Sequence, residues 1–124
     1  MVISGISGNL SAAPFEDKGD GTIYDNTTKL IWQKCGDGQD SLSCEGELVQ
    51  YNWSNSKIYC AQLTLAGKKW RLPSRQEIFG LLDLTVGKDP FINQVAFPNT
   101  KGYRYWSDTP YEKNPSVMWT VHFY

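Results

Sequence analysis

The sequence predicts an α+β domain in which two helices lie among short antiparallel strands and long loops. Runs of β-branched and aromatic residues mark short strands near both ends of the chain. Between these runs, two stretches carry apolar residues at the spacing of an α-helix. Residues 86–102 are interrupted by Pro and Gly and indicate irregular structure. A length of 124 residues and a mass of 14.1 kDa fit one domain with one core.

The N-terminal part predicts a tail followed by a β-hairpin. Residues 1–14 are small, aperiodic and rich in Gly and Ser, so we predict a flexible tail or linker there. We expect residues 15–124 to form the single domain. Within it, residues 22–24 and 29–33 are strand candidates, and the polar residues 25–28 between them are typical of a turn.

The first helix follows a polar segment. Asn52 or Ser54 can cap a helix that runs to about Ala66, where Gly67 follows. Ile58 and Leu65 lie near one face of this helix, which we expect to be buried.

The second helix has the clearest local signal. Ser74 and Glu77 form the sequence pattern of a capping box, in which each side chain satisfies a backbone amide of the first turn. Ile78, Leu81 and Leu82 follow at helical spacing. We therefore predict an amphipathic helix that begins after Ser74.

Two strands are expected at the C-terminal end. They are residues 103–107 and residues 117–123, in which apolar side chains alternate onto one face. Residues 108–116 between them are polar and bounded by Pro, and we predict a loop. Large apolar side chains in the predicted strands and extended segments should form the core: Trp32, Trp70, Leu72, Trp106 and Trp119.

The charge balance excludes several classes of protein. Twelve Lys and Arg against thirteen Asp and Glu leave a net charge of −1. A protein that binds nucleic acid mainly through phosphates needs a clear basic excess, so we expect no nucleic-acid partner. The hydrophobic fraction of 40% is too high for a disordered chain at such low charge. No stretch approaches the roughly 18 apolar residues of a membrane-spanning helix, so no membrane insertion is expected.

The cysteines indicate the compartment. Cys35 and Cys44 bracket a polar, Gly-rich segment, and a disulfide between them would stabilise the fold by roughly 2.5–3 kcal/mol. Free buried thiols and metal ligation are the alternatives, although zinc usually takes four ligands at closer spacing and the chain has one histidine. A disulfide implies an extracytoplasmic protein. Residues 1–8 do not resemble a signal peptide, so either a signal has been removed, which we expect, or the protein is cytosolic. Cys60 is either a small buried residue or pairs with a partner outside this chain.

No arrangement of residues predicts catalysis. The single histidine, His122, and the absence of a nucleophile–His–Asp or paired-carboxylate pattern give no acid–base machinery. We therefore expect no enzyme, no cofactor and no metal site.

Several short strings occur together in a fixed order and resemble one known family. They are Asp20-Gly21-Thr22, Leu30-Ile31-Trp32-Gln33, Trp70-Arg71-Leu72-Pro73-Ser74, Phe97-Pro98, Tyr105-Trp106-Ser107 and Trp119-Thr120-Val121. Over about residues 15–123 the chain resembles the C-terminal domain family of the Legionella collagen-like adhesin, a domain of bacterial secreted and surface proteins.

The resemblance implies a C-type-lectin-like fold and a binding role in adhesion. For the founding adhesin, the implied ligands are sulfated glycosaminoglycans and related host-surface polymers. Members usually continue into a last strand that carries a cysteine, so this chain is expected to lack that strand. The missing cysteine is then the natural partner of Cys60.

The candidate ligand-binding surface lies between residues 103 and 114. Aromatic rings stack on the apolar faces of sugar rings, and neighbouring polar side chains orient hydroxyl groups. The residues that offer this mixture are Tyr105, Asp108, Tyr111, Lys113 and Asn114. The alternative is that Tyr105 and Trp106 belong to the core and the loop is an ordinary exposed connection.

A local basic cluster is the second candidate surface. Its members are Lys68, Lys69, Arg71 and Arg75. A solvated face explains the cluster, and a contact with sulfate or carboxylate groups is the alternative.

These observations predict a non-catalytic binding or adhesion module of a secreted or surface bacterial protein. Its expected ligand is a polysaccharide or a glycosaminoglycan-like polymer. The alternative function is a structural or assembly subunit, or a tip domain, that binds another protein chain, and an oligomer would then be expected. An enzyme is the third hypothesis, because formylglycine-generating enzymes have a related lectin-like fold.

Overall fold

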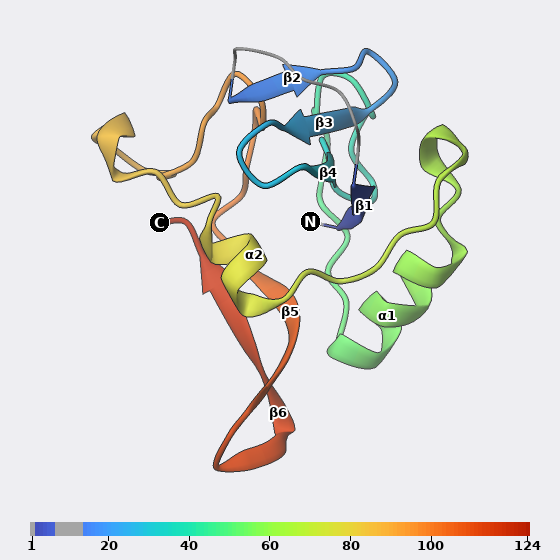
Figure 1. The fold of residues 1–124 in the computed structure, drawn as a ribbon, viewed down its shortest axis with the longest axis vertical. Coiled ribbons are helices and arrows are strands. Elements are labelled where there is room, and N and C mark those ends of the chain that lie inside the picture. The colour runs from blue at the N-terminus through green and yellow to red at the C-terminus, as the bar shows by residue number, and fades with distance from the viewer. Residues whose placement is uncertain (1, 7–13) are drawn as a thin grey trace.

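The computed structural model describes residues 2–6 and 14–124, and it has the predicted α+β architecture (Figure 1). The strands of the N-terminal third are β1 (Ile3–Ile6), β2 (Phe15–Asp17), β3 (Thr22–Asp25) and β4 (Leu30–Gln33). The helices α1 (Trp53–Gln62) and α2 (Arg75–Phe79) follow, with 3₁₀ turns at Leu65–Gly67 and Leu84–Val86. The strands β5 (Arg104–Tyr111) and β6 (Asn114–His122) end the chain.

The first four strands form an antiparallel sheet in the order β1-β4-β3-β2. The predicted hairpin at its centre is confirmed, with Ile23 opposite Trp32 across β3 and β4. Its turn is stabilised by Asp25, whose Oδ1 accepts a hydrogen bond from the Thr27 amide at 2.9 Å. The β-branched and aromatic residues of both strands are buried, as their strand propensity predicts.

Part of the predicted tail is a strand. Residues 3–6 form β1, which pairs with β4 and places Ile3 opposite Trp32. The physical reason is that Val2 and Ile3 are apolar and almost fully buried, at 3% and 0% exposure. Their burial stabilises this segment on the edge of β4. Residues 1 and 7–13 of the predicted tail lie outside the described residues.

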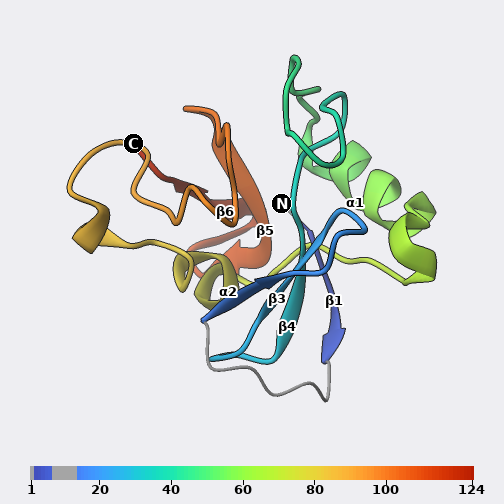
Figure 2. The same ribbon diagram turned by 90° about the horizontal axis from the view of Figure 1, so that it is seen from above.

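The sheet is covered on both faces by helices. Alternate side chains of a strand point to opposite faces, so each strand contributes to two separate clusters. One cluster packs Ile3, Ile23 and Trp32 against α2 and the irregular segment 91–97. The other packs Val2, Tyr24 and Ile31 against α1 and residues 70–72. Figure 2 shows α1 and α2 on opposite sides of the sheet.

Helix α1 begins where predicted but ends earlier and buries a different face. The Asn52 side chain caps it by accepting a hydrogen bond from the Asn55 amide at 2.8 Å. The helix stops at Gln62, because the next residue, Leu63, has an extended backbone. Its buried residues are Ser56 and Cys60, whereas Ile58 is 52% exposed. The predicted apolar face is wrong, because small side chains let α1 approach the second cluster closely.

Helix α2 confirms the capping box and is shorter than its apolar spacing predicts. Ser74 Oγ accepts from the Glu77 amide at 3.1 Å, and Glu77 Oε1 accepts from the Ser74 amide at 2.7 Å. Gly80 ends the helix, and single turns follow. Ile78 and Leu81 are nevertheless both buried, because the turns keep the two side chains on the core side.

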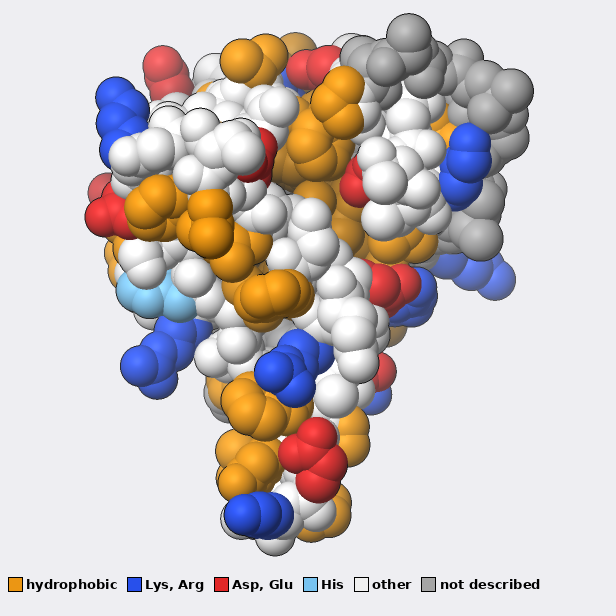
Figure 3. All heavy atoms as spheres, turned by 60° about the vertical axis from the view of Figure 1, so that its left-hand side comes forward, with side chains coloured by type: hydrophobic (Ala, Val, Ile, Leu, Met, Phe, Trp, Pro, Cys, Tyr) orange, Lys and Arg blue, Asp and Glu red, His pale blue; other side chains and the backbone are white. Residues whose placement is uncertain are grey.

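Strands β5 and β6 extend into a hairpin that projects from the rest of the molecule (Figures 1 and 3). The predicted loop at residues 108–116 is therefore wrong. Only Glu112 and Lys113 lie in the turn, and the strands continue to it on both sides. Pro110 and Pro115 indicated a loop, but proline is tolerated in a ribbon of two strands, where each strand has a free edge. We call residues 109–118 the arm.

An ion pair joins the end of the extended segment 70–73 to α2. Arg71 Nη1 and Nη2 each donate to one oxygen of Glu77 at 2.9 Å. This bidentate contact lowers the pKa of the Glu77 carboxyl and raises the pKa of the Arg71 guanidinium. Glu77 therefore holds both the guanidinium and the first amide of the helix cap.

We predict that Glu77 makes stability depend on pH. Because its folded pKa lies below the ordinary 4.5, its contribution is present above that pH and is lost as pH falls through the lowered value. Glu77→Gln keeps the cap and removes the charge. The variant should therefore lose about 1 kcal/mol of unfolding free energy at neutral pH, and its stability should change less with pH in the acid range. Urea unfolding at a series of pH values measures both effects.

The matched variant Glu77→Ala removes the cap as well and should be less stable than Glu77→Gln. Equal stability of wild type and Glu77→Gln at neutral pH would contradict the role of this ion pair.

Candidate functional site

A groove lies between the base of the β5–β6 hairpin and the segment that leads into α1. Its volume is about 660 Å³, and four aromatic residues line it: Tyr51, Trp53, Tyr103 and Trp106. We call these four residues the aromatic wall. Arg104 and Gln50 add a cation and an amide, and hydroxyl groups come from β6. Large aromatic side chains beside a few polar groups are typical of small-molecule and saccharide sites.

Main-chain hydrogen bonds fix two rings of the aromatic wall. Trp106 Nε1 donates to the Tyr51 carbonyl oxygen at 2.8 Å. Trp53 Nε1 donates to the Ser107 carbonyl oxygen at 3.1 Å. Buried indole N–H groups need such partners, and here each partner lies on the opposite side of the groove. The two hydrogen bonds therefore hold the groove at a fixed width.

A smaller cavity opens behind the aromatic wall. Its volume is about 120 Å³, and it lies between the hairpin base, α1 and the loop that follows β4. Its polar lining includes Gln33, Asp37, Tyr51 and Tyr59. The cavity and the groove share Tyr51, Tyr103 and Trp106 of the aromatic wall, so the two spaces are adjacent.

The polar groups of the cavity form a short network. Gln33 Nε2 donates to the Tyr59 hydroxyl at 2.8 Å, and the Tyr51 hydroxyl donates to Asp37 Oδ2. The rings of Tyr51 and Tyr59 are stacked, with centroids 5.5 Å apart. The contact with Asp37 raises the pKa of Tyr51 to about 12, and burial raises the pKa of Tyr59. Both phenols therefore stay neutral at physiological pH and act as hydrogen-bonding groups.

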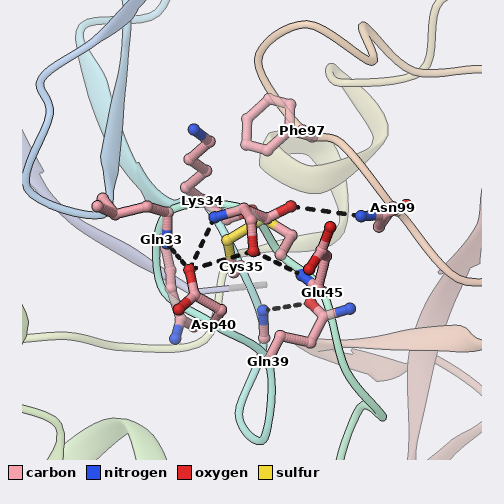
Figure 4. The surroundings of a disulfide bond; sticks show 12 residues. Gln33, Lys34, Cys35, Gln39, Asp40, Glu45, Phe97 and Asn99 are labelled. Carbon is pink, nitrogen blue, oxygen red and sulfur yellow. Dashed lines mark hydrogen bonds between the residues drawn. A yellow bond between two sulfur atoms is a disulfide. The ribbon is translucent and has the colours of Figure 1, made fainter.

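The predicted disulfide between Cys35 and Cys44 is confirmed (Figure 4). It closes the loop after β4, which supplies Asp37 to the cavity and ends at Tyr51. Asn99 donates from Nδ2 to the Ser43 carbonyl oxygen at 3.3 Å and ties the loop to the irregular segment before β5. The loop is too polar to be held by apolar burial, so the covalent bond positions one wall of the site.

Gly38 shows how tightly this loop is folded. Its φ is +88°, in the left-handed region, and an added Cβ would lie 2.5 Å from the Glu47 carbonyl oxygen. Only glycine fits there without a shift of the backbone.

Cys60 lies at the inner end of the cavity as a free cysteine that is 2% exposed. Burial raises the pKa of its thiol to about 11. The thiol is therefore protonated and inert at neutral pH.

The structure separates two of the predicted ligand-binding residues from the other three. Tyr105 packs its ring on Phe123 and accepts from the Lys101 amide, so it points into the structure, where it also lines the cavity. Asp108 lies 3.7 Å from Lys57 of α1.

The other three predicted residues belong to the arm. Tyr111 places its ring edge on Trp119, Lys113 lies in the turn, and Asn114 accepts from the Ser116 hydroxyl at 2.6 Å. These three residues lie together at the tip of the arm, where Tyr111 is opposite Asn114 across the two strands and Lys113 lies in the turn between them.

Two members of the basic cluster have partners within the fold. Arg71 is paired with Glu77, and the Arg75 guanidinium lies 4.2 Å from the ring centre of Trp119. Lys68 and Lys69 follow the first 3₁₀ turn.

The predicted core tryptophans differ in burial. Trp32 and Trp70 are buried, as is Leu72, whereas Trp106 and Trp119 are only half-buried. Trp106 faces the groove, and Trp119 is covered by Tyr111 and Arg75. These two tryptophans are only half-buried because the β5–β6 hairpin is a separate two-stranded sheet that projects from the core.

Sequence reasoning missed Tyr51, Trp53 and Tyr103. The usable signal was the pair of large rings Tyr51 and Trp53 on either side of the helix cap Asn52, because large aromatic residues in a polar segment often mark an interaction site.

We predict that thiol titration finds one cysteine. The native protein should react very slowly, because Cys60 is buried and protonated, and the unfolded, unreduced protein should release one thiol. The double variant Cys35→Ser/Cys44→Ser should be less stable by roughly 2.5–3 kcal/mol in urea unfolding. Detection of three thiols without reductant would contradict the disulfide.

Comparison with known proteins places the chain in one family. No curated protein and no solved structure matches it. Within residues 2–6 and 14–124, no helix is long and apolar enough to cross a membrane, and no group of His, Cys, Asp or Glu is arranged to hold a metal ion. A family model matches residues 21–124 and confirms the resemblance to an adhesin-related bacterial domain. The chain belongs to the Lcl C-terminal domain family.

Proposed function

We propose that this chain is a non-catalytic binding module that recognises polysaccharide in the groove beside the hairpin. The observation that carries the proposal is the aromatic wall, Tyr51, Trp53, Tyr103 and Trp106, along an open groove of about 660 Å³. A sugar ring has an apolar face that packs on an aromatic ring, and its hydroxyl groups need polar partners at the rim. The groove offers both.

The polar rim also fits host-surface polymers that carry acidic groups. Arg104 is exposed and lines the groove, and its planar guanidinium matches the geometry of carboxylate or sulfate groups. Binding that depends on this contact should weaken as salt rises, because exposed charges are screened.

The disulfide and the family support an extracytoplasmic location. Disulfides persist in oxidising compartments, and the Cys35–Cys44 bond closes a wall of the proposed site. The family resemblance supports a C-type-lectin-like arrangement, with helices flanking antiparallel strands and long loops carrying the site. We therefore place the module in a secreted or surface protein.

The proposal includes no catalytic step. The single histidine, His122, is exposed, and its Nε2 lies 3.2 Å from the Gly102 carbonyl oxygen, outside the residues that line the groove. The tyrosines of the site are neutral at physiological pH and serve hydrogen bonding.

We expect saturable binding to one or more polysaccharides. The probes are cello-, malto-, manno- and laminari-oligosaccharides and heparin, each measured by titration calorimetry. Tyr103→Ala removes an exposed ring of the aromatic wall and should weaken binding by roughly tenfold, equivalent to about 1.4 kcal/mol.

The matched control is Phe79→Ala. Phe79 is an exposed aromatic residue of α2, 58% exposed, and does not line the groove, so its removal should leave binding unchanged. Absence of binding by the wild type to every probe, or equal losses in both variants, would contradict the groove as the binding site.

Assembly with another protein chain is a second candidate function, favoured by the arm. Val117 is 48% exposed, and Figure 3 shows apolar side chains along the projecting hairpin with both charge signs near its end. A free ribbon of two strands is marginally stable in water, so a partner would stabilise it.

We expect Val117→Lys to test this alternative. If the arm mediates assembly, light scattering after size exclusion should show a concentration-dependent mass for the wild type and a monomer for the variant. A monomeric wild type at every concentration would leave the arm without a role in self-assembly.

A further inference from the structure

One ring of the aromatic wall, Trp53, is held by two separate contacts. Trp53 is the first residue of α1 and lines the groove. Its indole Nε1 donates to the Ser107 carbonyl oxygen of β5 at 3.1 Å. The ammonium group of Lys57, one turn further along the same helix, lies 4.9 Å from the centre of the Trp53 ring. A hydrogen bond therefore fixes the edge of the ring, and a cation attracted by the π electrons holds one face.

Lys57 is held in turn by Asp108 of β5. Lys57 Nζ lies 3.7 Å from Asp108 Oδ1, and both side chains are about half exposed. Asp108 directly follows Ser107, so two consecutive residues of one strand fix the indole, the first directly and the second through Lys57. The Asp108 amide also donates to the Pro73 carbonyl oxygen at 2.8 Å, which anchors this point of the strand.

Lys57 covers the Trp53 ring from outside the groove. Neither Lys57 nor Asp108 lines the groove or the smaller cavity, whereas Trp53 lines the groove. An aromatic ring has two faces, and a cation on one of them leaves the other for a ligand. The apolar face of a sugar ring packs on such a surface.

From this geometry we propose that Lys57 and Asp108 are positioning residues, which hold the Trp53 ring so that its other face stacks on a sugar ring in the groove. A ring that is fixed before the ligand arrives loses less conformational freedom on binding, and this strengthens binding. The inference rests on the proposed function, because it assumes that the groove holds polysaccharide. It gives Asp108, a predicted ligand-binding residue, an indirect role through Lys57.

The first test removes the cation and keeps a long side chain. Lys57→Met should weaken binding by roughly two- to fivefold, the range that corresponds to an exposed cation–π contact. Lys57→Arg keeps a cation that stacks on aromatic rings and should restore binding. The probes are cellohexaose, maltohexaose, mannohexaose, laminarihexaose and heparin, each measured by titration calorimetry.

The matched control is Lys88→Met. Lys88 is exposed and lines neither the groove nor the cavity, so this variant measures what the loss of one positive charge does to binding by itself. The expected result for every uncharged probe is unchanged binding. The effect of Lys57→Met on heparin is judged after the effect of Lys88→Met has been subtracted.

Urea unfolding separates positioning from a general structural role. Exposed ion pairs contribute little to the free energy of unfolding, so Lys57→Met should unfold at the same urea concentration as the wild type while it binds more weakly. Asp108→Asn removes the charge that holds Lys57 and should also weaken binding. In a protein that already carries Lys57→Met, Asp108→Asn should have no further effect on binding.

The second test asks whether Lys57 acts through Trp53. Trp53→Phe keeps a smaller ring, and a phenyl ring attracts a cation less strongly than indole does. Lys57→Met should therefore weaken binding less in Trp53→Phe than in the wild type. A double-mutant cycle on the binding constants measures this difference, and circular dichroism checks that each variant folds.

The outcomes separate this inference from the proposed function. Weaker binding in Lys57→Met, restored by Lys57→Arg and reduced in the Trp53→Phe background, supports positioning. Unchanged binding in Lys57→Met, the same loss in Lys88→Met, a clear loss of stability or equal losses in both backgrounds overturns positioning. Each of these results leaves polysaccharide binding in the groove intact, because Tyr103→Ala tests that binding independently. No binding by the wild type to any probe overturns the proposed function and this inference with it.

Discussion

The fold depends on the short extended segment at residues 70–73, which joins three parts of the molecule. Arg71 exchanges backbone hydrogen bonds with Ile3 of β1, at 3.2 and 3.1 Å, and thereby joins the first sheet. The Pro73 carbonyl oxygen accepts from the Asp108 amide at 2.8 Å and anchors β5. The side chain of Arg71 holds Glu77 of α2. Sheet, hairpin and helix are therefore positioned by four consecutive residues, in which proline fixes the extended backbone.

The groove depends on this junction and on the closed loop after β4. The junction places β5, and the disulfide places the loop that ends at Tyr51, so the two walls come from separate constraints. Trp106 and Trp53 connect the walls through hydrogen bonds between residues about fifty positions apart in the chain. The aromatic side chains thus connect the two walls and also line the groove. This dual role explains why half-buried tryptophans occur outside the core.

Features that depend on neighbours in sequence were predictable. The hairpin at β3–β4, the capping box at Ser74 and the Cys35–Cys44 disulfide all follow from local composition, and the structure contains each of them. Features that depend on distant segments were not. Strand β1 forms because residues 3–6 pair with the edge of β4, which lies far away in the sequence. The arm forms because β5 and β6 pair despite the prolines in both strands. The groove forms because residues 51–53 lie beside residues 103–106 in space, and no local sequence pattern predicts that these two segments meet.

The prolines of the arm have a consequence for contacts between copies of this domain. Pro110 and Pro115 provide no N–H group, so the outer edges of β5 and β6 are poor templates for an added strand. Copies of the domain would then resist pairing edge to edge into fibres. Of the side chains between these prolines, Tyr111 packs on Trp119, whereas Glu112, Lys113 and Asn114 are exposed at the tip. Selection can therefore alter what this projection touches while the scaffold stays the same.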